Sequence, residues 1–516
     1  MKATQGSLFL LFQPYIPGSL LLSATFSGDI HAAVKTVYES ITRISNMGQQ
    51  KTFCLLFSFM KVALPIMLML ASQFVTSAQQ NEILNRQLKT YEVKFKNLMA
   101  TRGLSYHEGR VNKNKIADVV REYGEDLEGN PQSTVGLLFY HFERDTLYHW
   151  LFNVEGLEAT SYLPVTIDSL ITLENTLKFS LSIDEKLNQS NRSIIKNQNK
   201  KFRLRTFQSV PLISEIFFPP AIVEKLSGKR HLIILPILNV SSFPFALLKP
   251  WGENNGTLID SLSYSFSHNF TQFFQSVESN AMGYDLNYTK KNEGYQFRLK
   301  DPLVCGNPAF IDSCTNGLPP LPGAENEALR VADMLQLTPL INTAAIKDSI
   351  ISRMHESNFI YFATHGWADP ESPLDNSFIA LSQPNGCGYL TPREIQSMDF
   401  THKPIVILSA CQTGLGMIHE AGIVGLARSF LKAGAQSVMM SLWNVNDSET
   451  EKLMNLFVRE LQNPHPFFPA EHWRQAVLKY KKEKGIEPVN WSAFQNFGVP
   501  YRLLGPVELI PLQKKD

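Results

Sequence analysis

The chain has 516 residues, and a length of this order predicts about two to four domains with enough apolar chain for a large core. Hydrophobic residues make up 44% and charged residues 18%, a balance that excludes wholly disordered, collagen-like and coiled-coil chains. The 48 basic and 47 acidic residues leave a net charge of +1, which gives no long-range field to hold a polyanion. We therefore expect no nucleic acid as the main partner.

A short apolar segment lies between basic and small residues in the N-terminal region. Residues 62–75 form an apolar run, Lys61 precedes it, and Thr76 and Ala78 follow it. A basic residue, an apolar run and small residues before a cut are the parts of a secretory signal peptide, so cleavage near Ala78 is expected. Residues 60–78 are therefore interpreted as a signal peptide, and this hydrophobic segment could contact a membrane transiently.

The position of this segment also bears on the start of the protein. A signal peptide should begin the chain, which makes Met60 the expected initiator and residues 1–59 an upstream extension. The alternative is a buried helical hairpin in which the long side chain of Lys61 reaches water. We expect export, to the periplasm or the extracellular medium, if residues 60–78 are a signal peptide, and membrane anchoring otherwise.

The chain then changes to helical and alternating patterns. In residues 79–133, apolar residues recur at spacings of three and four, which predicts a short helical lead-in. Residues 134–142 and 146–154 flank a charged turn and predict an antiparallel hairpin. Residues 188–201 are rich in Asn and Lys and predict an exposed loop or helix edge. No repeat with the period of a helical array is visible.

From about residue 231 onward, continuous apolar runs alternate with helical segments. This alternation predicts an α/β fold with a mainly parallel sheet covered by helices on both faces. The predicted strands are 231–238, 302–305, 359–364, 405–410 and 437–443, with residues 491–498 as a final strand at the sheet edge. The predicted helices are 324–335, 348–355, 421–433, 448–461 and 470–484.

Reactive or charged residues follow three of these strands. His365 follows the third strand, Cys411 the fourth, and Asp447 comes shortly after the fifth. In open α/β sheets, ligands bind beyond the carboxyl ends of the strands. If the three strands are parallel neighbours, these side chains share one rim of the sheet.

This combination of residue types is suited to acyl transfer. A histidine can take the proton of a thiol, leave a nucleophilic thiolate, and later protonate the leaving amine. The N–H groups of Gly366 and Cys411 could hold the oxyanion. The alternatives are that Cys411 is a small buried hydrophobe and that His365 is satisfied by a backbone carbonyl.

Sequence motifs around these residues resemble a known family. The motifs are YFATHG at 361–366, LSACQTGLG at 408–416, GLARSFLKAGA at 425–435 and SLWNVND at 441–447. They are similar to those of the CHAT family of caspase-like cysteine peptidases, which is related to caspases, gingipains and separase. The resemblance extends over residues 134–505.

The resemblance carries expectations for the fold and the site. It implies a caspase-haemoglobinase-like fold in which a non-catalytic half, residues 134–300, precedes a catalytic half, residues 301–516. It implies that His365 and Cys411 form the catalytic dyad, and that Asp447 is the carboxylate of a pocket for a basic residue. The helical repeats that commonly precede this domain are missing, and the family's frequent glutamate after the cysteine is Gln412 here.

Asp447 could have a structural role instead, and other carboxylates could line the pocket. An acidic residue before Ser448 is a good helix N-cap, which would give it a structural role. Asp369, Glu371 and Asp375 lie on the loop after His365 and could line the pocket instead.

The function expected from these observations is a cysteine endopeptidase that hydrolyses a peptide bond through an acyl-thioester, with a peptide or protein as substrate. The alternative is a catalytically silent caspase-like module that binds protein without turnover. No phosphate-binding loop and no metal-ligand spacing is present, so we expect neither a cofactor nor a metal.

The other cysteines leave a further question open. Cys305 and Cys314 are close enough in sequence for a disulfide if the protein is exported, and two free thiols are the alternative. Cys387 lies between two glycines and is interpreted as a turn residue.

Overall fold

The computed structural model describes two units of the chain. The described residues are 7–11, 21–25, 77–101, 111–124, 134–182, 209–267 and 269–498, the last range with gaps at 271–272, 275–287, 292–293, 298, 312–313, 316, 370–371, 410–416, 420–421, 444–446, 464–468 and 484–486. By internal contacts, the chain divides into Met1–Thr76 and Ser77–Asp516.

In the first unit, the described residues form a small antiparallel pair. It consists of β1 (Ser7–Leu11) and β2 (Leu21–Thr25). Residues 60–76, the greater part of the expected signal peptide, lie outside the described residues. Among the helices that the structure describes, none is long and apolar enough to cross a membrane.

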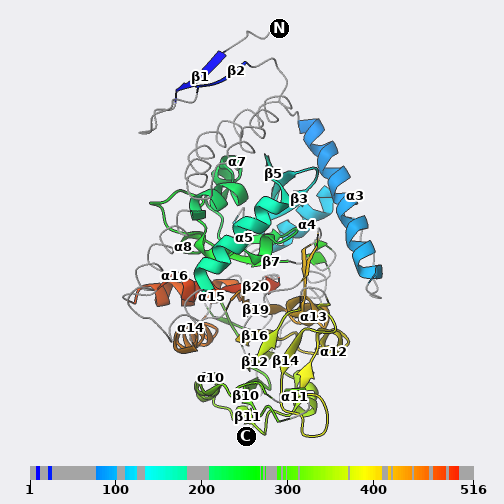
Figure 1. Cartoon of the computed structure of the whole chain (residues 1–516), viewed down its shortest axis with the longest axis vertical. Helices are drawn as coiled ribbons and strands as arrows, with labels where there is room; N and C mark the ends of the chain where they lie inside the picture. Colours follow the sequence, from blue (N-terminus) through cyan, green and yellow to red (C-terminus); the bar gives the residue numbers. More distant parts are fainter. Residues whose placement is uncertain are drawn as a thin grey trace. The chain divides into compact units, whose positions relative to one another are not determined.

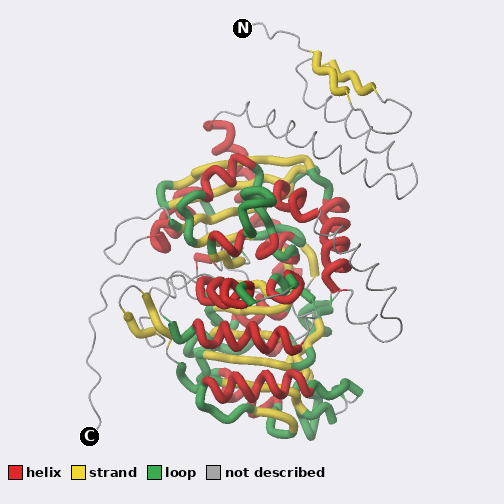
Figure 2. The backbone as a smooth tube through the Cα atoms, turned by 90° about the vertical axis from the view of Figure 1, so that its left-hand side faces the viewer, coloured by secondary structure: helices red, strands yellow, loops and turns green. Residues whose placement is uncertain are grey.

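The second unit is built on one large, mainly parallel sheet. In the described residues this sheet has 11 strands in the order β11-β10-β12-β16-β19-β20-β7-β6-β3-β4-β5. The strands are β3 (Val135–Phe142), β4 (Thr146–Asn153), β5 (Gly156–Pro164), β6 (His231–Leu235), β7 (Ser263–Phe266), β10 (Leu303–Pro308), β11 (Leu340–Asn342), β12 (Phe359–Ala363), β16 (Ile405–Ser409), β19 (Ser437–Ser441) and β20 (Phe494–Gly498). Figure 2 shows the strands stacked along the unit with helices lying against them.

The second half of this unit, residues 301–516, has the predicted alternation of parallel strands and helices. β10, β12, β16 and β19 pair in parallel, and their apolar side chains are almost all buried, as continuous apolar runs predict. On one side of the sheet lie α10 (Pro322–Met334), α14 (Asp447–Glu460) and α15 (Ala470–Lys481), and on the other α11 (Lys347–Met354), α12 (Pro392–Gln396) and α13 (Leu426–Lys432) (Figure 1).

β20 corrects the predicted place of the final strand. It lies in the interior of the sheet, antiparallel to β19 and parallel to β7, where Phe497 is in register with Phe266. The polar residues of this strand are buried and hydrogen-bonded to neighbouring segments: the Tyr264 hydroxyl lies 3.1 Å from Gln495 Oε1, and Ser437 bonds Asn496. Gly498 has a φ of +131°, and a Cβ there would lie 2.3 Å from the Gln436 carbonyl oxygen. Because it pairs with β19 on one side and β7 on the other, β20 joins the two halves of the sheet.

The first half, residues 134–300, begins with the predicted hairpin. β3 and β4 pair antiparallel across the turn at Arg144 and Asp145, both of which have positive φ, and this confirms the hairpin. The helix α3 (Ser77–Thr101) packs against these strands, where the Trp150 indole donates to Gln87 Oε1 at 2.9 Å. α4 (Lys113–Gly124) contacts the same strands. Residues 188–201 lie outside the described residues.

Candidate active site

Strand register places the ends of the two strands that precede the expected dyad residues side by side. β12 and β16 are parallel neighbours, and Ala363 at the end of β12 is in register with Ser409 at the end of β16. His365 is the second residue after Ala363, and Cys411 is the second residue after Ser409. Cys411 itself lies outside the described residues. The carboxyl ends of β12 and β16 therefore lie at the same rim of the sheet, where ligands bind in open α/β sheets.

The backbone of His365 is held by a second, smaller sheet. This sheet consists of β13 (Gly366–Trp367), β14 (Phe378–Ala380) and β15 (Tyr389–Leu390). Ala380 N donates to the His365 carbonyl at 2.9 Å, and the Thr364 hydroxyl donates to the Ala380 carbonyl at 2.7 Å. The two hydrogen bonds fix the chain where it leaves β12.

The ring of His365 is oriented by a backbone carbonyl. Its Nε2 lies 2.8 Å from the carbonyl oxygen of Pro319, and the ring of Phe310 lies 5.1 Å away between centroids. A carbonyl can only accept, so Nε2 carries the hydrogen, and in the neutral imidazole Nδ1 then holds the lone pair. A backbone carbonyl partner is the structural alternative expected for His365 from the sequence, and such a partner is present. It leaves Nδ1 as the nitrogen that can accept a proton.

The Pro319 carbonyl belongs to the loop that follows β10, here called the β10 loop (residues 309–321). Its base is closed by Asn307, a buried residue with a φ of +42°. The side chain of Asn307 accepts from Leu321 N at 2.7 Å and donates to Glu325 at 2.7 Å. Asparagine tolerates left-handed backbone better than most residues, which suits it to this position.

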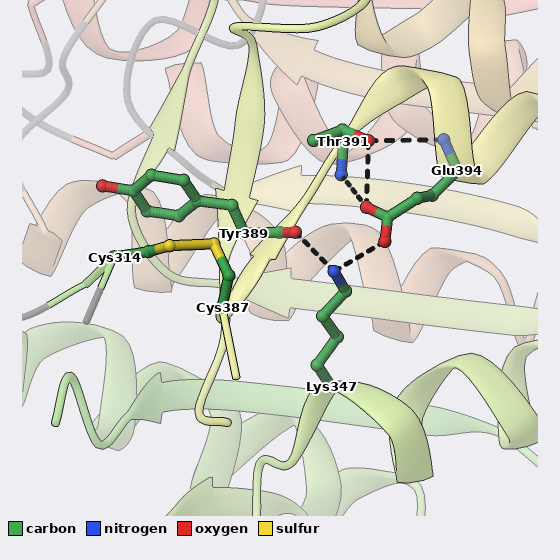
Figure 3. The surroundings of a disulfide bond; sticks show 6 residues. All are labelled: Cys314, Lys347, Cys387, Tyr389, Thr391 and Glu394. Carbon is green, nitrogen blue, oxygen red and sulfur yellow. Dashed lines mark hydrogen bonds and ion pairs between the residues drawn. A yellow bond between two sulfur atoms is a disulfide. The ribbon is translucent and has the colours of Figure 1, made fainter. Parts of the chain in front are cut away.

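A disulfide crosses from this loop to the small sheet and corrects the cysteine interpretation. Cys314 is bonded to Cys387, 73 residues away, with a Cα–Cα distance of 5.2 Å (Figure 3). Cys305 is not its partner, because it lies inside β10, paired in register with Phe362 and fully buried. Burial raises the pKa of the Cys305 thiol, which makes it an inert core residue.

Gly366, the expected oxyanion donor, is the first residue of β13. It pairs in register with Ile379 of β14 and is partly exposed. It directly follows His365, so its backbone lies at the same rim.

Asp447 begins α14 beyond the neighbouring strand. β19 is parallel to β16, with Met440 in register with Leu408, so the carboxyl ends of these two strands lie at the same rim. The side chain of Asp447 lies outside what the structure describes.

The loop carboxylates considered for the pocket make contacts of their own. Asp375 forms a two-point ion pair with Arg393, with N–O distances of 2.5 and 2.9 Å. Asp369 Oδ1 accepts from Ser372 N at 2.6 Å, within its own loop. Glu371 lies outside the described residues. Of the three alternatives, the two that are described therefore have local structural roles.

A buried pair beneath the rim was not predicted from the sequence. The hydroxyl of Tyr361 donates to the carboxylate of Glu327 on α10, and both side chains are buried. Burial, with the nearby carboxylate, raises the pKa of Tyr361 well above its ordinary value, so the phenol stays protonated. Tyr361 was singled out only as part of a motif, and no local signal pointed to Glu327.

Two further features of the rim were missed for physical reasons. The Pro319 carbonyl has no side-chain signature because every residue carries a carbonyl. The pairing of Cys314 with Cys387 depends on the path of a loop rather than on a pattern. In the part of the chain that the structure describes, no group of three or more His, Cys, Asp or Glu residues could hold a metal ion.

Comparison with known proteins places this architecture in context. Residues 209–499, more than half of the chain, match the CHAT domain. Tetratricopeptide repeat protein 28 of Homo sapiens is 26% identical over 318 residues, covering 54% of this chain and 12% of that protein. Its counterpart in Mus musculus is 26% identical over 322 residues, covering 55% and 13%. The chain thus spans about an eighth of the length of these curated relatives.

A solved structure has a similar fold over most of the chain. The separase–securin complex of Saccharomyces cerevisiae superposes with a TM-score of 0.53 at 11% identity, covering 92% of this chain and 37% of that chain. At this identity the likeness concerns the fold alone. With the family match, it confirms the caspase-like, mainly parallel α/β fold.

Proposed function

Since this chain belongs to the CHAT domain family, we propose that it is a cysteine endopeptidase in which Cys411 and His365 act together. The observation that carries the proposal is the ring of His365, whose Nε2 is hydrogen-bonded to the Pro319 carbonyl just beyond β12, the parallel neighbour of the strand β16 that precedes Cys411. This hydrogen bond leaves a basic Nδ1, the nitrogen that a neighbouring thiol would need.

The proposed reaction begins with proton transfer from the thiol of Cys411 to Nδ1 of His365. The thiolate attacks the carbonyl carbon of the scissile peptide, and the N–H groups of Gly366 and Cys411 hold the oxyanion. The imidazolium then gives its proton to the leaving amine, which leaves an acyl-thioester on Cys411.

Water completes the proposed cycle. His365 takes a proton from the water that attacks the thioester, and returns it to the departing thiolate. The Pro319 carbonyl supports this exchange because a hydrogen bond from an imidazolium is stronger than one from a neutral ring. The carbonyl also keeps the ring in one orientation throughout.

The proposal extends to the residue on the acyl side of the cut. A carboxylate at the rim selects Lys or Arg, because an unpaired desolvated cation costs far more than a paired one. Asp447 is the residue proposed for this pocket. It is supported by the parallel pairing of β19 with β16, the strands that precede Asp447 and Cys411, and by the local partners of Asp369 and Asp375.

Incubation with a fluorogenic peptide library tests the peptidase directly. The wild-type protein should release fluorophore, and Cys411→Ala should not. A chloromethyl or acyloxymethyl ketone should label the wild type at Cys411 and leave Cys305 unmodified, because Cys305 is fully buried. If the wild-type chain hydrolyses none of the peptides and takes up no label, the alternative of a silent binding module replaces the peptidase.

Export is proposed on a separate observation. The Cys314–Cys387 disulfide suits an oxidising compartment, because cytosolic thiols are kept reduced. Mass spectrometry of the protein from its native host should find an N-terminus near Ala78. An N-terminus at Met1 on a soluble cytoplasmic protein would contradict export.

A further inference from the structure

The β10 loop is held at its base and in its middle. At the base, Asn307 binds Leu321 N and Glu325. In the middle, Cys314 is tied to Cys387. The Pro319 carbonyl that orients the His365 ring lies between these two attachments. Of the two, the covalent attachment is the one that can be opened chemically.

The far side of the disulfide is braced. Cys387 lies on the connection between β14 and β15, where the rings of Phe378 and Tyr389 stack with centroids 3.7 Å apart. Lys347 Nζ donates to the Tyr389 carbonyl at 2.7 Å and to Glu394 at 2.6 Å (Figure 3). Glu394 in turn closes a capping box with Thr391 at the start of α12. The disulfide therefore fastens the loop to a segment that ring stacking and hydrogen bonds hold in place.

The same support holds the other side of His365. Ala380 on β14 donates to the His365 carbonyl, and the Pro319 carbonyl on the β10 loop accepts from the ring. The backbone and the ring of one histidine are thus fixed by two segments that are far apart in sequence. The covalent bond that joins these two segments is the Cys314–Cys387 disulfide.

We infer that the Cys314–Cys387 disulfide is a positioning element for His365, and that its reduction lowers turnover by releasing the Pro319 carbonyl from the imidazole. This inference rests on the proposed function of the same site and adds a redox dependence to it. A neutral ring without that acceptor can place its hydrogen on either nitrogen. The fraction with a hydrogen on Nδ1 cannot accept the thiol proton at that nitrogen.

The chemical step is ordinary thiol–disulfide exchange. A dithiol reductant attacks one sulfur as a thiolate and forms a mixed disulfide. Its second thiol then closes the reductant's own disulfide and releases Cys314 and Cys387 as thiols. Two electrons and two protons pass from the reductant to the protein. Cys411 takes no part.

The direction in which a reductant changes kcat distinguishes this role of the disulfide from the usual behaviour of thiol enzymes. Reductants normally preserve activity by keeping the nucleophile from oxidation. Here dithiothreitol should lower kcat as the Cys314–Cys387 bond opens, and reoxidation should restore it. Alkylation and mass spectrometry would measure the open fraction in each sample.

The test compares the Cys314→Ser/Cys387→Ser double variant with the wild type, with Cys305→Ala as the matched control. We expect the double variant to lose about 10- to 100-fold in kcat, the range typical of removing an outer-shell partner, with KM little changed. Cys305→Ala should keep the wild-type kcat. If the double variant does not fold, reduction of the folded wild type replaces it.

A second readout does not depend on hydrolysis. Carbon-13 labelling of histidine reports the tautomer of His365, with His365→Gln used to assign the signal. The disulfide-bonded protein should show the Nε2–H form, and the reduced protein or double variant a mixture of tautomers. An unchanged tautomer, or an unchanged kcat in an active double variant, would overturn the inference. If no form hydrolyses peptide, the proposed function fails, and the tautomer still decides the positioning role.

Discussion

Two histidines of this unit donate a hydrogen bond from Nε2 to a backbone carbonyl, but their surroundings are very different. His149 on β4, in the first half, is fully buried, with Nε2 2.7 Å from the Ile216 carbonyl oxygen. His365, in the second half, is partly exposed beyond the end of β12, with Nε2 2.8 Å from the Pro319 carbonyl oxygen. Burial lowers the pKa of His149 to about 4, so it stays neutral in the core. The same hydrogen bond supports packing inside the sheet and can support proton transfer at its rim.

Removing His365 should have the largest effect on activity. His365→Ala should lower kcat/KM by about 10²–10⁴-fold, the usual contribution of a general acid and base. The matched control is His355→Ala. His355 Nδ1 also lies 3.0 Å from a carbonyl oxygen, that of Asp399, and His355 is at the end of α11, away from the rim. Steady-state rates on one fluorogenic peptide measure both. Similar rates in the two variants would remove His365 from the mechanism.

Acid should destabilise the first half through His149. The folded-state pKa of about 4 lies below the ordinary value of 6.5, so the unfolded chain binds the proton more readily. Its contribution to stability is complete above pH 6.5 and falls as the pH drops toward 4, by about 3 kcal/mol in all. Urea unfolding at several pH values should show a weaker pH dependence in His149→Gln than in the wild type.

Leu151→Ala serves as the control for the acid effect. Leu151 is a buried residue of the same strand and carries no titratable group, so this variant should lower the unfolding free energy without changing its dependence on pH. Parallel curves for the wild type and His149→Gln would show that the buried imidazole does not remain neutral.

Charge selection at the rim should give a smaller but more specific effect. Asp447→Asn should reduce turnover of Lys or Arg substrates about tenfold more than turnover of a neutral one, since a hydrogen bond to a charged group contributes about 1.5–3 kcal/mol. If Asp447 serves only the start of α14, stability falls by about 1 kcal/mol and the ratio of the two rates stays constant. Asp375→Asn is the control, because Asp375 is paired with Arg393.

The smallest expected effect is on the support of the small sheet. Thr391 is the N-cap of α12, and its side chain accepts from Glu394 N. Thr391→Ala should lower the free energy of unfolding by about 1 kcal/mol, while Thr391→Ser keeps the hydroxyl and most of the stability. Chemical unfolding measures both variants. Equal losses would show that the methyl group rather than the cap is responsible.

The parallel strands of the second half were predictable because their signal is local. The apolar runs at 359–364 and 405–410 correspond to β12 (Phe359–Ala363) and β16 (Ile405–Ser409), each within one residue. A buried parallel strand needs apolar side chains on both faces, and that pattern is visible in any short window. The placement of His365 at a strand end follows from it directly.

The remaining features of the fold and the site depend on contacts between segments far apart in sequence, which a short stretch of sequence does not show. The interior place of β20 depends on its pairing with β19 and β7, and the partners of its polar residues Gln495 and Asn496 lie on distant segments. The orienting group for His365 is a main-chain oxygen. The Cys314–Cys387 pair joins two loops 73 residues apart. Residues 410–416 and residues 60–76, the greater part of the expected signal peptide, lie outside the described residues, so the role of Cys411 and the cleavage near Ala78 stay predictions.

Because β20 lies inside the sheet and near the end of the sequence, the sheet can be completed only late in synthesis. Until residues 494–498 emerge from the ribosome, β7 and β19 each lack the neighbour that separates them in the finished sheet. Unpaired strand edges are templates for association with other chains, and pairings between distant segments form slowly. The β7 edge therefore stays open from Phe266, and the β19 edge from Ser441, until Phe494 emerges, and a chain that stops before Phe494 keeps both edges open. Such truncated products should aggregate rather than fold as half-size proteins.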